Sequence, residues 1–347
     1  MSEGHTIHAL AARLRPVLLQ RTVEVSSPRG PWDLVSARLQ GLRVTCVEAW
    51  GKNLLIGLSA DPVAAGGGEA DEGGTHHGKA DGGKAEGGKA EPVPADPNRG
   101  TTRYLHVHLG MHGTVRTVPG SPLGTRTPLN TPPGTGARAT GAASSRDRSA
   151  GRPWREPGQG APADLRIDTG EHAVQVWRPR TCEVLSSLGR HALIEHLGPD
   201  PLRPDADPER GWLRLHASCD PIGVAVLDQR VIAGIGNVYR AELLWRQRLD
   251  PFQPAGSVRR DAFDALWRDA QEIMPLGVAT NSIVSRDEEI RRLRAALAAG
   301  LSVRGFRPTH EAYRRAGQPC SRCGDLIAQV NQGSRRLYYC PTCQTTR

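Results

Sequence analysis

Residues 320–343 read CSRCGDLIAQVNQGSRRLYYCPTC, and this stretch decides the fold of the C-terminal part. Two Cys-x-x-Cys pairs, Cys320 with Cys323 and Cys340 with Cys343, are separated by 16 residues. Each pair places two thiolates on one tight turn, and a hairpin of this length returns the second pair to the first. The spacing predicts a closed four-sulfur site for one structural zinc ion. Disulfides are the competing interpretation, and the lack of a secretory signal argues against them.

The stretch between the two cysteine pairs carries a basic tip. Arg335 and Arg336 precede the strand-like run Leu337, Tyr338 and Tyr339. Arginines on a rigid hairpin are typical of phosphate contacts in nucleic-acid-binding proteins. The hairpin is therefore expected to present cations to a polyanion as well as to bind zinc.

The composition of the whole chain also favours a polyanionic partner. The chain has 347 residues, enough for two or three domains, with a formal net charge of +9 and a pI near 9.6. It contains no apolar run of about 18 residues, which predicts no membrane span, and its start, MSEGHTIH, lacks the features of a secretory signal. We expect a reduced cytoplasmic compartment with access to DNA, in which Cys46, Cys182 and Cys219 are buried or idle thiols.

Two low-complexity stretches interrupt the first half of the chain. Residues 61–100 consist mainly of Gly, Ala, Lys, Asp and Glu and include the repeat GGKAEGGKAE, whereas residues 119–163 are rich in Pro, Thr and Arg. Both are poor in the apolar side chains that would offset the entropy of ordering, so we predict two disordered insertions. The arginines of the second insertion are compatible with DNA contacts, but a solvated linker is the preferred interpretation.

Periodicity in the first half predicts a β domain that begins with one helix. Apolar residues recur on one helical face of residues 5–20, with Thr6 as the expected N-cap. The turn WGKN, which carries Lys52, separates two of the predicted strands. Apolar runs and alternation predict strands at 44–47, 54–58, 105–109 and, as a pair around a glycine turn, within 164–177.

Helical patterns replace the strands after Leu188. An apolar stretch at 222–235 is expected to form a helix that the turn AGIGN joins to the next one. Glycine turns between helices expose backbone N–H groups that bind phosphate, although such turns are common in helical proteins. The other predicted helices are 190–197, 238–248, 262–274 and 288–299.

Taken together, these stretches resemble the formamidopyrimidine-DNA glycosylase and endonuclease VIII family of bifunctional base-excision repair enzymes. The resemblance covers most of the sequence outside the low-complexity stretches. Five motifs in the family's order are far more specific than any one of them alone. The matching stretches are SEGHTIH (2–8), WGKNLL (50–55), HLGMHG (108–113), GIGNVYRAELLWRQRLDP (234–251), and the zinc hairpin in AYRRAGQPCSRCG (312–324) and SRRLYYCPTCQ (334–344).

The resemblance implies a role for each matching residue. After removal of Met1, the α-amine of Ser2 would attack the sugar C1′ of a flipped nucleotide and form a Schiff base, with Glu3 as the acid/base carboxylate. Lys52 matches the lysine that binds phosphate and supports catalysis. The other matches are DNA contacts: Asn237 on a backbone phosphate, Arg335 as a catalytic-site arginine on the phosphates around the everted nucleotide, Arg336 at the hairpin tip, and Met111 in the vacated base stack.

Ser2 departs from the family pattern, which ordinarily has proline at this position. Serine is small enough for Met1 to be removed, and it leaves a primary amine that still forms a Schiff base, with different basicity and less rigidity. The reference pKa of an α-amine, about 8, leaves roughly a tenth of it neutral at pH 7. A second carboxylate that is often found in the family is replaced by His5 and Thr6. A protein that binds DNA without turnover is therefore an alternative hypothesis.

Several of these residues also fit structural roles. His106 and His108 fall on one face of a predicted strand, and with His112 they are interpreted as structural or DNA-facing rather than as a second metal site. The structural alternatives for the matched residues are a helix N-terminus for Glu3, a solvated turn for Lys52 and the apolar core for Met111.

The sequence thus predicts an α+β multidomain protein in three parts. The expected activity is excision of oxidised bases, with pyrimidines favoured, followed by nicking of the abasic site. A monomer is expected to act on double-stranded DNA with oxidised bases or abasic sites, in the cytoplasm and associated with the nucleoid. An RNA-binding protein is a further alternative, which leaves Glu3 and Lys52 unexplained. The predicted parts are an N-terminal β-sandwich with flanking helices (1–188), a helix–two-turns–helix DNA-binding domain (189–302) and a zinc-ribbon hairpin (303–347).

Overall fold

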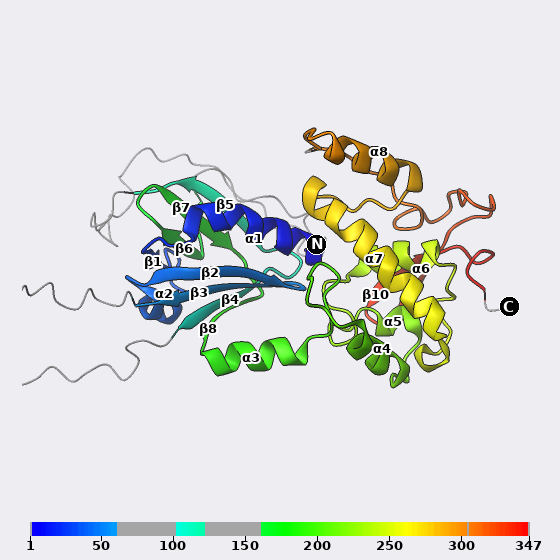
Figure 1. The fold of residues 1–347 in the computed structure, drawn as a ribbon, viewed down its shortest axis with the longest axis horizontal. Helices are drawn as coiled ribbons and strands as arrows, with labels where there is room; N and C mark the ends of the chain where they lie inside the picture. Colours follow the sequence, from blue (N-terminus) through cyan, green and yellow to red (C-terminus); the bar gives the residue numbers. More distant parts are fainter. Residues whose placement is uncertain (1, 61–101, 122–160, 304, 346–347) are drawn as a thin grey trace, which may run out of the picture.

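The computed structural model describes residues 2–60, 102–121, 161–303 and 305–345, which form a β-sandwich and a helical part that carries a two-stranded hairpin (Figure 1). The first predicted insertion lies outside the described residues, and so does most of the second one. Pro119 ends β5 and Ala163 is buried in the core, so both ends of the second predicted insertion belong to the described part of the fold.

The β-sandwich consists of two antiparallel four-stranded sheets. One has the order β2-β3-β4-β8 and the other the order β1-β6-β7-β5. Alternate residues of both sheets point into a shared core, which α1 also enters, and this confirms the predicted sandwich. The strands are β1 (Glu24–Ser26), β2 (Arg43–Trp50), β3 (Asn53–Ser59), β4 (Arg103–His108), β5 (Thr114–Pro119), β6 (Leu165–Asp168), β7 (His172–Trp177) and β8 (Thr181–Leu185).

Helix α1 (Gly4–Leu18) lies along the sandwich and also packs against the helical part. Its apolar face is buried, as its periodicity predicts. The predicted N-cap, Thr6, is wrong, because the backbone N–H of Thr6 already donates to the carbonyl oxygen of Glu3. Glu3 therefore holds the N-cap position, with extended backbone (φ −115°, ψ 175°). A second helix, α2 (Asp33–Leu39), was not predicted.

The second half of the chain is helical, and its core is continuous with that of the hairpin. Cys320, Ile327 and Tyr338 of the hairpin lie in the same buried cluster as the helices. Among the described residues, no helix is long and apolar enough to cross a membrane. The helices are α3 (Ser187–His196), α4 (Pro208–His216), α5 (Ile222–Ala225), α6 (Asn237–Arg246), the 3-10 turn η1 (Ala255–Ser257), α7 (Arg260–Thr280) and α8 (Asp287–Ala298).

The apolar stretch 222–235 is not one helix. Only α5 is helical, and the chain then runs through two turns before α6 begins. The backbone N–H of Ala233 donates to the carbonyl oxygen of Pro199, outside any helix, and Gly234 has φ +94°. Ile222, Val231, Ile232 and Ile235 are all buried, so the apolar run reflects burial in the core rather than one face of a helix.

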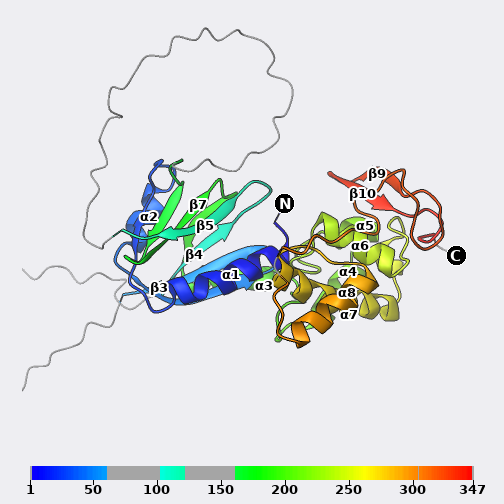
Figure 2. The same cartoon turned by 90° about the horizontal axis from the view of Figure 1, so that it is seen from above.

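The hairpin pairs β9 (Ala328–Gln332) with β10 (Arg335–Tyr339) in antiparallel register. It lies along one edge of the helical part, beside α5 and α6, and its tip points toward the sandwich (Figure 2). The N-terminus lies between the sandwich and the helical part, and the hairpin tip points toward it (Figure 2). The N-terminus and the hairpin tip therefore approach the same region of the molecule.

Candidate active site

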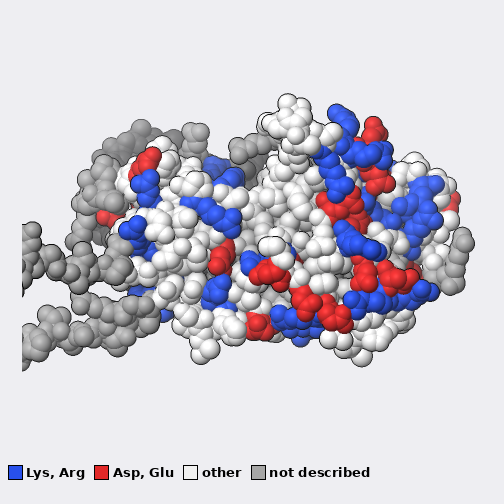
Figure 3. All heavy atoms as spheres, in the orientation of Figure 1, with Lys and Arg blue, Asp and Glu red and all other residues white. Residues whose placement is uncertain are grey.

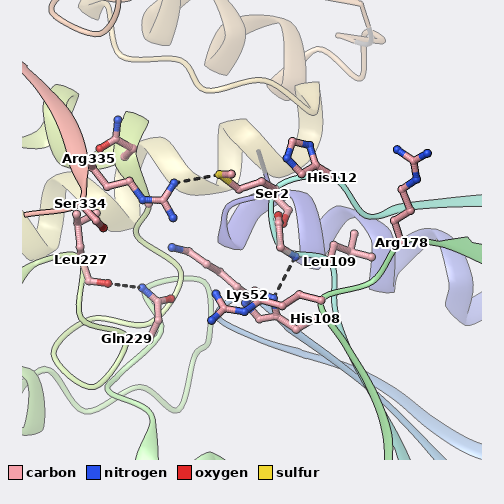
Figure 4. Close-up of a pocket in the computed structure, with 15 residues that line it drawn as sticks. Ser2, Lys52, His108, Leu109, His112, Arg178, Leu227, Gln229, Ser334 and Arg335 are labelled. Atoms are coloured by element: carbon pink, nitrogen blue, oxygen red, sulfur yellow. Dashed lines mark hydrogen bonds between the residues drawn. The ribbon is translucent and has the colours of Figure 1, made fainter. Parts of the chain in front are cut away.

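A cleft of about 720 Å³ opens where the sandwich, the two turns before α6 and the hairpin meet (Figure 4). It brings together residues from six separate parts of the sequence. The predicted site residues that line it are Ser2, Lys52, Met111, Asn237 and Arg335.

Three glycines allow the chain segments behind the cleft to touch. Gly51 has φ +56°, and a Cβ atom there would lie 2.9 Å from the Cβ of Ala233 and from the backbone N of Gly234. The backbone N–H of Gly4 donates to the carbonyl oxygen of Gly234 at 2.8 Å. The N-terminus, the β2–β3 turn and the two-turn segment therefore form one rigid floor, from which Lys52 projects.

Glu3 lies in this floor, and its side chain is only 1% exposed. Its carboxylate accepts backbone N–H groups from Gly236 (3.1 Å), Val238 (2.9 Å) and Tyr239 (3.3 Å). Burial raises the pKa of Glu3, and the nearby charge of Lys52 opposes that shift. The carboxylate thus occupies the positive N-terminal end of α6 while remaining close to the charge of Lys52.

Lys52 donates a hydrogen bond from Nζ to the carbonyl oxygen of Ile235 at 2.6 Å. Burial lowers the pKa of Lys52 to about 8, the charge of Glu3 opposes this shift, and the charge of Arg335 adds to it. An amine in this range changes its charge close to physiological pH. Lys52 is therefore not the solvated turn lysine of the structural alternative.

The β2–β3 turn is also supported from behind by Asp200, which sequence analysis did not single out. This carboxylate is 2% exposed and accepts the backbone N–H of Gly51 at 2.7 Å. It also bonds His8 Nε2 at 2.7 Å and the backbone N–H of Leu202 at 3.0 Å. Asp200 therefore ties α1, the turn that carries Lys52 and the start of the helical part to one point.

Ser2 is attached to the loop between β4 and β5. Its hydroxyl donates to the carbonyl oxygen of Gly110 at 2.7 Å, and the backbone N–H of Gly110 donates to Nδ1 of His108 at 3.0 Å. Burial, with the charge of Arg180 as the next cause, lowers the pKa of His108 to about 4. The ring is therefore neutral near pH 7, and its Nδ1 is free of a proton and able to accept.

Arg335 reaches across the mouth of the cleft from β10. Its Nη1 lies 3.2 Å from Sδ of Met111, drawn as a dashed line in Figure 4. The Met111 side chain is 51% exposed, so it is not the core residue of the structural alternative. The hairpin arginine and the loop methionine therefore contact each other.

Asn237 connects the start of α6 to the hairpin. Its Nδ2 donates to the backbone carbonyl of Arg336 at 2.9 Å, and its Oδ1 accepts from Arg240 at 2.6 Å. Arg240 also donates to the Arg336 carbonyl at 3.0 Å. The side chain of Arg336 is exposed at the tip, while its backbone holds the hairpin in place. This arrangement fixes the backbone next to Arg335, from which the Arg335 side chain extends.

The four hairpin cysteines fit a zinc ion. Their Sγ atoms all lie within 4.8 Å of one another. A tetrahedral site with bonds of about 2.3 Å requires sulfur separations of about 3.8 Å. The measured separations are 4.0 Å between Cys320 and Cys343 and 3.4 Å between Cys323 and Cys340. The donor set and its spacing match a closed structural site rather than two disulfides.

Among the three histidines of the β4 region, His106 is structural. Its two ring nitrogens lie 2.9 Å from Glu183 and 2.9 Å from Asn53. His108 and His112 line the cleft instead. Sequence reasoning missed part of this lining because most of these residues lie in loops without periodicity. The missed lining residues are Arg178, Arg180, Leu227, Gln229 and Ser334.

On the face of the molecule drawn in Figure 3, charges are mixed rather than gathered in one basic field. On the face in Figure 3, basic and acidic side chains alternate over the helical part. Arg260 pairs with Glu209 and Arg294 with Glu272. The cations that face the cleft are therefore better placed to hold a polyanion than the net charge alone implies.

Comparisons with protein families identify two of the three parts. Residues 197–289 match the formamidopyrimidine-DNA glycosylase H2TH domain. Residues 317–346 match a zinc finger found in FPG and IleRS. Together with the sulfur geometry, the second match shows that Cys320, Cys323, Cys340 and Cys343 hold a structural zinc ion.

Whole-length relatives extend the match to the sandwich. Endonuclease 8 1 of Mycobacterium tuberculosis is 32% identical over 346 residues, which cover 99% of this chain and 100% of that protein. Formamidopyrimidine-DNA glycosylase of Laribacter hongkongensis is 28% identical over 354 residues, with 99% and 100% covered.

Solved structures agree in fold. Lactococcus lactis Fpg in complex with DNA that contains an abasic site has a TM-score of 0.60 and 16% identity, covering 99% of this chain and 100% of that one. MutM (Fpg) of Thermus thermophilus has a TM-score of 0.60 and 22% identity, with 99% and 98% covered. The chain belongs to the formamidopyrimidine-DNA glycosylase and endonuclease VIII family of DNA glycosylases with AP lyase activity.

Proposed function

We propose that this chain excises oxidised bases, with oxidised pyrimidines preferred, and nicks the resulting abasic site through the α-amine of Ser2. The observation that carries the proposal is that Ser2 lies in the same cleft as Lys52, Asn237 and Arg335. Ser2 and Arg335 come from opposite ends of the sequence. A reacting amine beside three residues that could bind phosphate is the arrangement that a flipped nucleotide needs.

The nucleophile is the amine that removal of Met1 exposes on Ser2. Its nitrogen bonds to C1′ while the bond from C1′ to the base breaks, and the base leaves with the bonding electron pair. The nitrogen then loses a proton and forms a second bond to C1′ while the bond from C1′ to the ring oxygen breaks, and that oxygen takes up a proton, so that an open-chain Schiff base results. The Schiff base makes the proton on the neighbouring sugar carbon acidic, and loss of this proton expels the 3′ phosphate by β-elimination. A primary α-amine suits this reaction because its reference pKa, about 8, is far below that of lysine.

Glu3 and Lys52 support this chemistry from the floor of the cleft. A buried carboxylate with a raised pKa is suited to carry a proton between the sugar and the amine. The three N–H groups that it accepts also fix its position, so the acid/base role and the helix-capping role are compatible. Lys52, next to Glu3, supplies positive charge for a phosphate and favours the ionised carboxylate.

Asn237, Arg335 and Arg336 grip the DNA backbone, and Met111 fills the space that the flipped nucleotide leaves. Cations and amides on rigid elements offset the unstacking of one base, which costs a few kcal/mol. Zinc contributes by fixing the hairpin on which Arg335 stands. We further propose that the protein acts as a monomer on double-stranded DNA, in the cytoplasm and in association with the nucleoid. Family membership favours this enzyme over the non-enzymatic damaged-DNA-binding protein.

Borohydride trapping tests the nucleophile. The protein is incubated with DNA that contains one abasic site, reduced with borohydride and digested, and the cross-linked peptide is located by mass spectrometry. We expect a covalent adduct on the α-amine of Ser2. Tight binding to abasic DNA without an adduct would instead support the binding protein.

The mass of the intact N-terminus is the first control. A chain that retains Met1 has no free amine on Ser2 and cannot react in this way. A matched protein with an extra residue before Ser2 tests the same point on a folded chain. It is expected to bind abasic DNA but not to be trapped. Trapping at an unchanged yield would show that the nucleophile is another group, and Lys52 would be the first candidate.

A further inference from the structure

The two methionines in the described residues have opposite environments. Met111 is 51% exposed at the mouth of the cleft, whereas Met274 is 0% exposed in the core of α7. Met1, the third methionine of the chain, lies outside the described residues. Any oxidant that reaches methionine sulfur from solvent will therefore meet Met111 long before Met274.

The Met111 sulfur is also in contact with a DNA-facing cation. Nη1 of Arg335 points at Sδ at 3.2 Å, and no carboxylate of the described residues lies within ion-pair distance of this guanidinium. A thioether is a weak acceptor, so this contact holds Arg335 only loosely and is readily exchanged for a phosphate. The strength of the contact depends on the oxidation state of the sulfur.

We propose that Met111 is a reversible oxidation site for two-electron oxidants of the peroxide class, and that its sulfoxide withdraws Arg335 from DNA. In the reaction with hydrogen peroxide, the sulfur lone pair attacks one peroxide oxygen and the O–O bond breaks. The sulfur gains that oxygen and loses two electrons, and the other oxygen leaves as water. A sulfoxide reductase with a thiol donor restores the thioether.

Two physical consequences of the sulfoxide act in the same direction. Its oxygen is a strong hydrogen-bond acceptor at a site where a guanidinium already points, and bonds from charged donors are stronger than neutral ones. Its polarity also makes the side chain costly to insert between stacked bases, because the S–O dipole loses its hydration there. Oxidation therefore favours the closed contact across the cleft and disfavours the DNA-bound arrangement.

This inference rests on the proposed function, because it needs Met111 and Arg335 to contact DNA. The zinc-loaded protein is treated with dilute hydrogen peroxide, and peptide mass spectrometry measures oxygen gain at Met111 and at Met274. Affinity is measured with DNA that contains a tetrahydrofuran abasic-site analogue, which cannot form a Schiff base. We expect oxygen gain at Met111 only, an affinity about tenfold lower, and recovery after sulfoxide reductase treatment.

Met111→Leu is the matched control, since it keeps the volume and removes the sulfur. Each protein is compared with its own untreated baseline, so any damage to the zinc cysteines appears equally in both. We expect the affinity of Met111→Leu to stay within twofold of its baseline. Arg335→Gln tests the other partner: in this variant oxidation should lower affinity less than in the parent, because only the cost of inserting the polar sulfoxide between bases remains.

The inference is overturned if Met111 is oxidised without loss of affinity. It is also overturned if Met111→Leu loses as much affinity as the parent, or if Met274 is oxidised as fast as Met111. Failure of the proposed function gives a different result: the untreated parent would neither bind the abasic-site analogue nor be trapped by borohydride on abasic DNA.

Discussion

The hydroxyl of Ser2 donates a hydrogen bond to the carbonyl oxygen of Gly110 at 2.7 Å, which joins the N-terminus to the loop that carries Met111. The family ordinarily has a proline here, whose ring restricts the backbone at the nucleophile. Serine has no ring, but a hydroxyl tied to a loop residue restricts the same position from outside. The peptide of Gly110 is itself held, since its N–H donates to the neutral imidazole of His108.

Removal of this hydroxyl is expected to slow the reaction without weakening binding. Ser2→Ala keeps a primary amine and a small residue, so only the bond to Gly110 is lost. One hydrogen bond of about 1 kcal/mol corresponds to a rate reduction of roughly fivefold. Single-turnover incision of abasic DNA measures the rate, and the tetrahydrofuran analogue measures affinity. Ser2→Thr, which keeps a hydroxyl, should stay near the parent rate, and equal rates for alanine and threonine would contradict the idea.

The shifted pKa of Lys52 predicts a pH dependence of DNA binding. Burial places this pKa at about 8, well below the ordinary value of 10.5. Below pH 8 the ammonium is charged in the free protein, and above it a phosphate-bound Lys52 must take up a proton on binding. Affinity for the tetrahydrofuran analogue is therefore expected to fall as the pH rises from 8 to 10, by at most about tenfold per pH unit for one proton.

Lys52→Arg isolates this effect from other groups. Arginine stays charged over the whole range, so the variant should lose the part of the pH dependence that Lys52 causes. The α-amine of Ser2 titrates in a similar range and is present in both proteins. An identical slope in parent and variant would assign the whole effect to groups other than Lys52.

Glu3→Gln separates the two roles of the carboxylate. Three backbone N–H groups point at it, and a glutamine presents one acceptor and an amide that repels them. The free energy of unfolding is expected to fall by about 1–3 kcal/mol. If Glu3 also transfers protons, base excision should fall by about a hundredfold or more. Chemical denaturation and an excision assay on the same preparation decide between the capping role and the proton-transfer role. A loss of stability with near-normal excision would show that Glu3 acts only as a helix cap.

Sequence alone located the parts of the site whose determinants are local. The Cys320–Cys323 and Cys340–Cys343 pairs carry their ligand geometry in their spacing, and the family motifs placed Ser2 in order with the hairpin. The contacts of Glu3 could not be seen in this way, because its partners on α6 are more than 230 residues distant in the chain. The same holds for Asp200, whose role depends on a turn 149 residues earlier.

The two-turn segment shows a different limit. Residues 222–235 are apolar enough to suggest a helix, yet only α5 forms, and the turns after it bury apolar side chains as a helix face would. The sequence did contain a signal for the start of helix α4, because Asp207 is followed by Pro208 and Glu209. In the structure Asp207 is the N-cap, and its side chain accepts the backbone N–H of Glu209. Strand β8 is short, and Cys182 is its one buried residue, so it shows little alternation.

Gly51 makes the rigid floor of the cleft testable. Gly51→Ala forces a side chain into positive φ, which costs roughly 1–2 kcal/mol, and places Cβ 2.9 Å from Ala233 and Gly234. Gly41→Ala is the matched control, because Gly41 has φ +72° but nothing within 4 Å of its added Cβ. In chemical denaturation, the free energy of unfolding of both variants should fall by about the strain energy, because both place alanine at positive φ. Only Gly51→Ala should also lose single-turnover incision, by about tenfold or more, since a shift of the β2–β3 turn moves Lys52. Equal incision by both variants would show that the cleft does not depend on this close approach.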